Sequence, residues 1–269
     1  MQLFKLIAAL ALALYASGAR AEDAKDSSLE DLAKAAQNPI ADMVSVPFQN
    51  VTAFRVGPYR QTADILNIQP VVPFHLNEDW NLITRTTIPV VSQVRSSQFH
   101  GPMLGIGDVN QILAFSPANS GSVIWGVGPT ISYPTASERL LGAEKWSAGP
   151  TFVALFTPDP WVVGVLANNI WSFSGSHQRE RVSQMMAQYF INYNFSDGSY
   201  ISSSPIVTAN WAGNGRDRWV VPVGGGVGRL FLIEGQAVDA QIGAYYNVVR
   251  PESGPRWQVR FDLSFLFPK

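Results

Sequence analysis

Three histidines are the residues best suited to metal binding or acid–base chemistry in this cysteine-free chain of 269 residues. His75, His100 and His177 are far apart in the sequence, and none has a histidine or cysteine partner at close spacing. Histidine-containing zinc sites usually draw two ligands from one closely spaced pair. The spacing therefore predicts no metal site, and we expect no cofactor.

Ser176 and His177 are a nucleophile and a base side by side, as an acyl hydrolase would need. However, neighbours on an extended chain point to opposite faces, and no asparagine or aspartate nearby could orient the histidine. Gly224–Gly228 is glycine-rich, but it connects strand-like segments, whereas a phosphate cradle opens a helix. We expect no catalytic residues, and we expect these glycines to allow close approach or bending of the backbone.

The composition excludes several classes of protein. Charged residues make up only 14% of the chain against about 25% in typical domains, and the formal net charge is −1. Nothing here provides a basic surface for nucleic acid. Cysteine is absent, which excludes a disulfide scaffold.

The first residues have the pattern of a secretory signal. Lys5 precedes the short apolar run Leu6–Tyr15, and Ala19-Arg20-Ala21 is a small-x-small cleavage site. We expect residues 1–21 to be removed and the mature protein to be exported. Residues 22–50 are expected to form an N-terminal periplasmic segment, with one helix over 28–36 that ends before Pro39. This segment could plug a lumen, dock at its mouth or be a flexible lead-in.

From residue 51 to 269 the sequence predicts strands. In Trp257–Phe267 the odd positions are apolar and most of the even positions are polar, which is the alternation of a strand with one apolar face. The runs match the length of about 9–11 residues that tilted strands need to cross a membrane. We predict an all-β, antiparallel, up-and-down transmembrane barrel of about 12 strands. The expected strands are 51–57, 64–74, 79–91, 106–115, 122–133, 145–157, 160–171, 182–195, 199–210, 217–229, 235–249 and 256–267.

Aromatic residues recur at the expected strand ends. Phenylalanines lie 36 to 41 residues apart, with short turns after several of them and longer polar stretches between. Because aromatic side chains favour the lipid–water boundary, we assign them to two girdles. The inner girdle would contain Phe74, Trp80, Phe115, Phe156, Trp161, Phe195, Tyr200, Phe231 and Phe267. The outer girdle would contain Tyr133, Trp146, Trp171, Trp211, Trp219 and Trp257. A soluble β-sandwich with these aromatics in its core is the alternative.

Polar residues on the opposite faces of the same strands should point into the lumen. A charge on the lipid face costs about 2–4 kcal/mol at the membrane midplane, so Arg85, Arg260 and Asp262 are expected to face inward. The candidates are Arg85, Gln188, Asp239, Arg260 and Asp262. They could line a selective conduit, or they could pair and stabilise a closed lumen. Pro70, Pro89, Pro129, Pro150, Pro205 and Pro222 remove ladder donors, so some of them must lie at bulges or strand ends.

Several segments together resemble a proteobacterial family named for a phenol-degradation meta-pathway (MetA) protein, whose members are also labelled transporter or neuromedin U. The resemblance covers most of residues 32–267. It is carried by Leu32–Gln49, Asn67–Phe74, Leu76–Val90, Gly107-Asp108, Phe115–Pro117, Trp125–Pro129 and Pro134-Thr135. The resemblance implies an outer-membrane β-barrel with no established catalytic residues, and it implies aromatic solutes only by association.

We therefore expect a bacterial outer-membrane barrel that passes small, hydrophobic or aromatic solutes. A structural or plugged barrel and a lipid-modifying enzyme are the alternatives. The expected partners are membrane lipid, the barrel-assembly machinery during biogenesis and an unidentified small solute.

Overall fold

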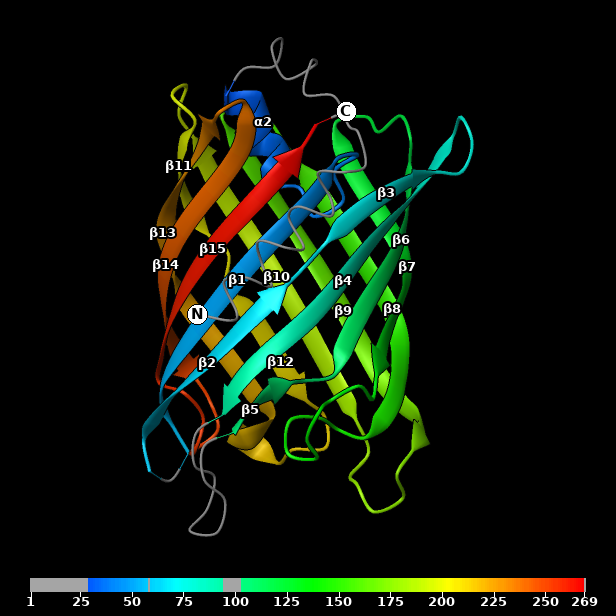
Figure 1. Cartoon of the computed structure of the whole chain (residues 1–269), viewed down its shortest axis with the longest axis vertical. Helices are drawn as coiled ribbons and strands as arrows, with labels where there is room; N and C mark the ends of the chain where they lie inside the picture. Colours follow the sequence, from blue (N-terminus) through cyan, green and yellow to red (C-terminus); the bar gives the residue numbers. More distant parts are fainter. Residues whose placement is uncertain (1–28, 58, 94–102, 269) are drawn as a thin grey trace.

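One antiparallel sheet closes on itself in the computed structural model, which describes residues 29–57, 59–93 and 103–268 (Figure 1). Within these residues the strands form a closed barrel with twelve strand positions around its circumference, as the alternation predicted. We call each of these positions a stave. The elements are α2 (Leu29–Ala36), β1 (Val44–Val56), β2 (Gln61–Ile68), β3 (Val71–His75), β4 (Trp80–Gln93), β5 (Met103–Ile106), β6 (Val109–Pro117), β7 (Val123–Tyr133), β8 (Lys145–Phe156), β9 (Trp161–Gly175), β10 (Ser183–Asn194), β11 (Ser199–Ser203), β12 (Ile206–Asn210), the 3-10 helix η2 (Gly215–Arg218), β13 (Trp219–Ile233), β14 (Gln236–Val249) and β15 (Trp257–Phe267).

The first and last strands seal the barrel. β1 pairs with β15 from Val44 opposite Phe267 to Phe54 opposite Trp257, and every other stave pairs with its neighbours in the chain. Three of the twelve positions are each occupied by two consecutive short strands. These pairs are β2 with β3, β5 with β6, and β11 with β12. The circuit of paired strands therefore closes on itself, as a barrel in lipid requires.

β1 begins at Val44, earlier than the expected start at residue 51. Thr52 on this strand donates to Asn50 (3.2 Å) and to Asp64 of β2 (2.6 Å). Asn50 and Thr52 lie on the same face of β1 as Val46 and Phe48, so they interrupt the apolar alternation of this strand in the sequence. Residues 44–50 therefore belong to the barrel wall and not to the N-terminal segment.

Five of the six prolines noted in the sequence lie where the pairing of strands is interrupted or shifted. Pro70 and Pro205 separate β2 from β3 and β11 from β12, and Pro222 sits at a register shift between β13 and β14. Pro129 and Pro150 face each other across β7 and β8, and pairing with the outer neighbours β6 and β9 skips them. The missing donors are thus concentrated at breaks, as expected for proline in a sheet without edges.

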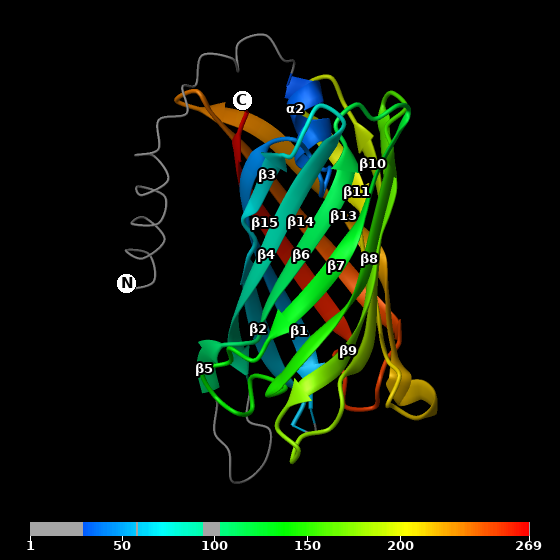
Figure 2. The ribbon, with the colours of Figure 1, turned by 90° about the vertical axis from the view of Figure 1, so that its right-hand side faces the viewer.

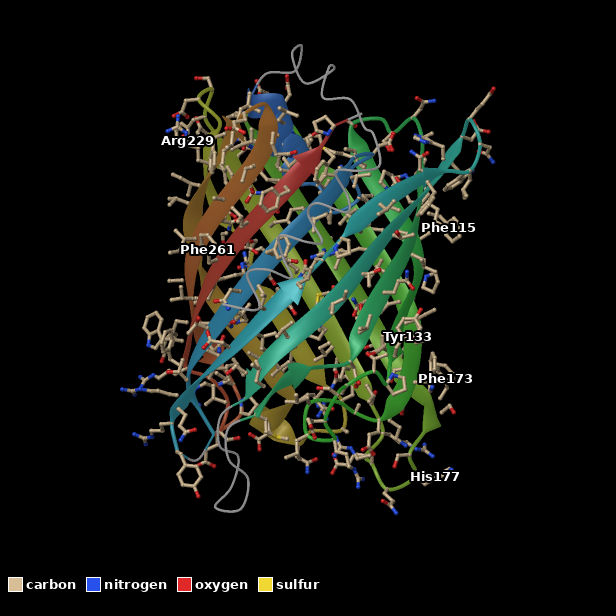
Figure 3. The ribbon with its side chains drawn as sticks, in the orientation of Figure 1. Phe115, Tyr133, Phe173, His177, Arg229 and Phe261 are labelled. Atoms are coloured by element: carbon tan, nitrogen blue, oxygen red, sulfur yellow. The ribbon has the colours of Figure 1, made fainter. Side chains whose placement is uncertain are left out.

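The outer surface of the barrel is apolar between two sets of aromatic residues. Phe261 on this surface is 45% exposed, and Phe115 and Phe173 also lie on it, with Phe173 nearer the end that carries His177 (Figure 3). The expected girdle residues Phe74, Trp80, Phe115, Phe156, Trp161, Phe195, Trp211 and Trp257 are all exposed large hydrophobics, whereas Trp219 and Phe267 are half-buried. An exposed apolar band of this kind fits lipid and not water, which places the protein in a bacterial outer membrane.

The sequence-based assignment of Tyr200 to the inner girdle is wrong. Tyr200 is only 2% exposed, and its hydroxyl donates to Asp239 inside the barrel. It lies near a strand end like the girdle residues, but it faces inward with Ser202 of the same strand, β11. A buried phenol needs a hydrogen-bond partner, and only the lumen offers one.

The two ends of the barrel differ. α2 lies at the end where strands are joined by turns of two to five residues, and β5 lies at the opposite end (Figures 1 and 2). The longer connections 134–144, 176–182 and 211–218 are at that opposite end. Short turns face the periplasm in outer-membrane barrels, so we expect α2 on the periplasmic side and name the two ends of the barrel periplasmic and extracellular accordingly. No described helix is long and apolar enough to cross a membrane. The expected signal, residues 1–21, lies outside the described residues.

Candidate solute pathway in the lumen

The extracellular half of the lumen holds a cavity of about 440 Å³. Its wall alternates amide and hydroxyl side chains with methionine and isoleucine, so it can contact both polar and apolar parts of a solute. This volume is within the range of about 300–1,000 Å³ that small-molecule sites occupy. The lining includes Gln49, Asn67, Gln69, Arg85, Thr87, Asn110, Ile112, Asn168, Ile170, Gln184, Met186, Gln188, Ile206 and Thr208.

A second, smaller cavity of about 140 Å³ lies on the periplasmic side of the first. Gln49, Gln69, Arg85 and Gln188 line both cavities, and they come from β1, the β2–β3 junction, β4 and β10. We call these four residues the junction ring. Arg85 donates a hydrogen bond to the Gln69 side-chain oxygen, which ties two members of the ring together.

Arg260 is fixed beside the smaller cavity by a dense set of contacts. Its guanidinium donates to the Ser204 carbonyl oxygen (2.8 Å), the Tyr245 hydroxyl (2.9 Å) and Asp262 (3.0 Å). The guanidinium carbon also lies 4.9 Å from the centroid of the Tyr245 ring. Asp262 in turn accepts from the Gln49 side chain at 2.8 Å. The charges at this level are therefore held in place and linked to the junction ring.

Tyr200 and Asp239 form a second fixed pair in the same cavity. The phenol oxygen lies 3.0 and 2.9 Å from the two carboxylate oxygens. The ring of Tyr200 lies against Gly228 of β13, where an added Cβ would come within 2.3 Å of it. Gly228 thus leaves room for an aromatic ring against the barrel wall, whereas Gly224, Gly225 and Gly226 of the same strand lie close to the backbone of neighbouring strands.

Replacing Gly228 by valine is expected to lower the free energy of unfolding by about 1–3 kcal/mol, the usual cost of overpacking a filled interior. The valine side chain would push the Tyr200 ring away from Asp239. Urea unfolding of the refolded barrel, followed by tryptophan fluorescence, measures this loss. Gly121→Ala is the control, because nothing lies within 4 Å of a Cβ there. An unchanged midpoint for Gly228→Val would contradict the packing.

The periplasmic end of the lumen is occupied by the chain's own N-terminal segment. In α2, Ala33 is 0% exposed and packs with Leu32 against Leu230, Ala237 and Leu266 of the wall. Four residues beyond α2, Ile40 joins a separate apolar cluster on the strands β3 to β10. The smaller cavity is bounded on this side by residues 36–39. Residues 32–43 therefore lie in the periplasmic mouth, which is one of the three arrangements that the sequence left open.

Polar contacts fix this N-terminal segment to the wall. Lys34 pairs with Asp159 in the turn before β9, and the Gln37 side chain donates to Asn194 of β10 at 2.7 Å. His75 Nε2 lies 2.9 Å from Asp42. The segment thus contacts several staves through side chains as well as through its apolar face.

The five lumen candidates from the sequence all line the smaller cavity, and two of them, Arg85 and Gln188, belong to the junction ring. Sequence reasoning missed Tyr200, Ser204 and Tyr245 as lumen residues. Tyr200 and Ser204 share the even-numbered, inward face of β11 and its junction, and Tyr245 shares the face of Asp239 and Gln241. The alternation of strand faces could therefore have identified these residues as inward-facing. Tyr200 was instead assigned to the girdle because it is aromatic and lies near a strand end.

The other candidates for chemistry lie apart from the lumen. His177 projects from the β9–β10 loop at the extracellular end (Figure 3). The Ser176 hydroxyl accepts from the Gln178 amide at 3.3 Å, and within the described residues no hydrogen bond joins Ser176 to His177. His100 lies outside the described residues. Among those residues, no cluster of three or more histidine, aspartate or glutamate side chains could hold a metal ion.

Comparison with known proteins gives a fold but no family. No family model and no curated protein matches the chain, so the resemblance to the MetA family stays an expectation. The COG4313 outer membrane channel from Pseudomonas putida F1 superposes with a TM-score of 0.62 at 16% identity, over 84% of this chain and 94% of that one. At this identity the similarity establishes the fold alone.

Two other solved barrels are more distant. Outer membrane phospholipase A from Escherichia coli has a TM-score of 0.46 at 12% identity, over 90% of this chain and 98% of that one. A Pseudomonas aeruginosa FadL homologue has a TM-score of 0.39 at 10% identity, over 86% and 92%.

Proposed function

We propose that this protein is an outer-membrane channel that carries small solutes through its lumen and is closed at the periplasmic end by its N-terminal segment. The supporting observation is the pair of cavities that meet at the junction ring and lead from the extracellular side to residues 36–39. A barrel with a purely structural role has no need for so much polar space next to fixed charges.

The lining favours solutes with an apolar body and a polar or anionic group. Methionine and isoleucine side chains supply the apolar contacts, and Arg85 is placed where the two cavities join. Small aromatic acids and alcohols fit this description and are the first class to test. The COG4313 channel, with the same fold, is consistent with a transport role.

The first test is permeability of the refolded mature chain, residues 22–269. Arg85→Gln is expected to shift the ion selectivity in planar bilayers towards cations, because it removes a fixed positive charge at the junction ring. Arg260→Ala should shift selectivity in the same direction and further, because it also leaves Asp262 without its guanidinium partner. Liposome swelling with small aromatic solutes provides the second readout.

Controls separate loss of function from loss of fold. Heat-shifted gel mobility must first establish that each variant is a folded barrel. Arg139→Gln is a matched control, because Arg139 pairs with Glu144 in an exposed extracellular loop away from the cavity linings. Selectivity that is the same in Arg85→Gln, Arg260→Ala and the unmodified protein would show that solutes do not pass the junction ring.

A closed, structural barrel is the second candidate, and the position of residues 32–43 in the periplasmic mouth favours it. It predicts a folded protein that passes no solute even after the N-terminal segment is displaced. A hydrolase is not proposed, because the described residues bring no base into hydrogen-bond contact with the Ser176 hydroxyl.

A further inference from the structure

Three extracellular connections enclose a hollow of about 870 Å³ on one side of the barrel rim. They are the β1–β2 hairpin, η2 and the β14–β15 loop. The Gly57 amide donates to the Ser253 carbonyl oxygen (2.7 Å), and the Arg256 amide donates to that of Phe54 (3.0 Å), so the hairpin and the loop are joined. The hollow is separate from both lumen cavities. Its lining is Arg55, Gly57, Arg60, Asp217, Arg250, Pro251, Glu252, Ser253 and Arg256.

This hollow lies beside the outer aromatic girdle. The guanidinium of Arg256 is 5.7 Å from the ring centroid of Tyr246, and that ring packs edge-on against Trp257 at 4.8 Å. Trp257 is an exposed girdle residue and pairs across the sheet with Phe54. Girdle aromatics mark the depth at which acyl chains give way to headgroups. Arg256 therefore lies at the level of the outer-leaflet headgroups.

The charge of the lining is unusual for this chain. Four arginines face two carboxylates, so the hollow has a formal charge of +2 in a protein whose total is −1. One carboxylate, Asp217, accepts from the Glu252 amide at 3.2 Å. Arg250 is used structurally, because its guanidinium donates to the carbonyl oxygens of Pro251, Glu252 and Gly254.

The exposed arginines are then Arg55, Arg60 and Arg256. Guanidinium groups match the geometry of phosphate oxygens and bind them with paired hydrogen bonds. The outer leaflet of this membrane is built from glycolipid with phosphorylated sugars, so the anion available at this depth is a sugar phosphate on a lipid. We propose that the arginine hollow binds the phosphorylated headgroup of an outer-leaflet glycolipid of the lipid A type.

The experiment is a titration of the refolded mature protein in detergent with lipid A, followed by native mass spectrometry. We expect one lipid A to bind preferentially, and lipid A without phosphate to bind much more weakly. Each exposed arginine near a charged lipid surface is expected to contribute about a fivefold change in affinity. Arg55→Gln, Arg60→Gln and Arg256→Gln together should therefore weaken binding by about 100-fold.

Arg229→Gln is the matched control, because Arg229 is an exposed arginine on the outer surface at the periplasmic end (Figure 3). It should leave lipid A affinity unchanged. Equal affinity for lipid A with and without phosphate, or an unchanged affinity in the folded triple variant, would overturn the proposal. Displacement of lipid A by millimolar inorganic phosphate would also overturn it, because the hollow would then be an anion site and not a lipid site.

Discussion

Aspartate in place of Ala33 is expected to raise the conductance of the refolded barrel several-fold. Ala33 of α2 is fully buried against the wall residues Leu230, Ala237 and Leu266. An unpaired carboxylate there costs several kcal/mol. An eight-residue helix has little stability of its own to resist this, because isolated helices below about 12–15 residues are marginal in water. The segment should leave the periplasmic mouth while the twelve staves remain paired.

Two measurements on one sample make this result interpretable. Trypsin cleavage after Lys34 reports whether the segment has left the mouth, and single-channel recording reports the conductance. Ala212→Asp is the matched control, because it introduces the same charge at an exposed position in the extracellular loop before η2. If cleavage increases and conductance does not, the lumen is closed at another level, and the structural barrel becomes the better description.

The sequence could not place this segment, although it predicted the barrel around it. The strands were readable because lipid outside and polar side chains inside impose opposite residue types on alternate positions of each strand, as in β15. The sequence of α2 has no such imprint, because this helix does not separate lipid from a polar lumen. The small apolar face of α2 would look the same in the sequence whether the segment plugs the lumen, docks at its mouth or is a flexible lead-in. The inward faces of β13, β14 and β15 supply the apolar residues against which α2 packs, and their positions depend on the whole barrel.

The sequence predicted which residues face the lumen, but it did not predict which of them contact one another. Alternation put Arg260 and Asp262 inside, but their partners Ser204, Tyr245 and Gln49 are up to 213 residues away in the chain. Which inward residues share a level depends on strand register and tilt, and a single sequence encodes these only through the complete circuit of hydrogen bonds. The junction ring could therefore not be derived in advance.

Arginine at Ile242 is expected to lower the free energy of unfolding in lipid vesicles by about 2–4 kcal/mol. Ile242 lies midway along β14, is 53% exposed on the outer surface and pairs with Phe261 and Val227, which are also exposed. A guanidinium at this position would sit in the hydrocarbon. Urea unfolding of the folded, vesicle-embedded protein, with tryptophan fluorescence as the signal, gives the free energy.

Gln241→Arg is the matched variant, one residue away on the same strand. Gln241 faces the smaller cavity, whose lining also contains the carboxylates of Asp239 and Asp262, so the new charge has partners there. The loss should be clearly smaller than for Ile242→Arg. The two variants share a strand and an introduced side chain, and they differ in the face that receives it. Equal losses would mean that the outer surface is not in lipid, and the soluble alternative would then have to be reconsidered.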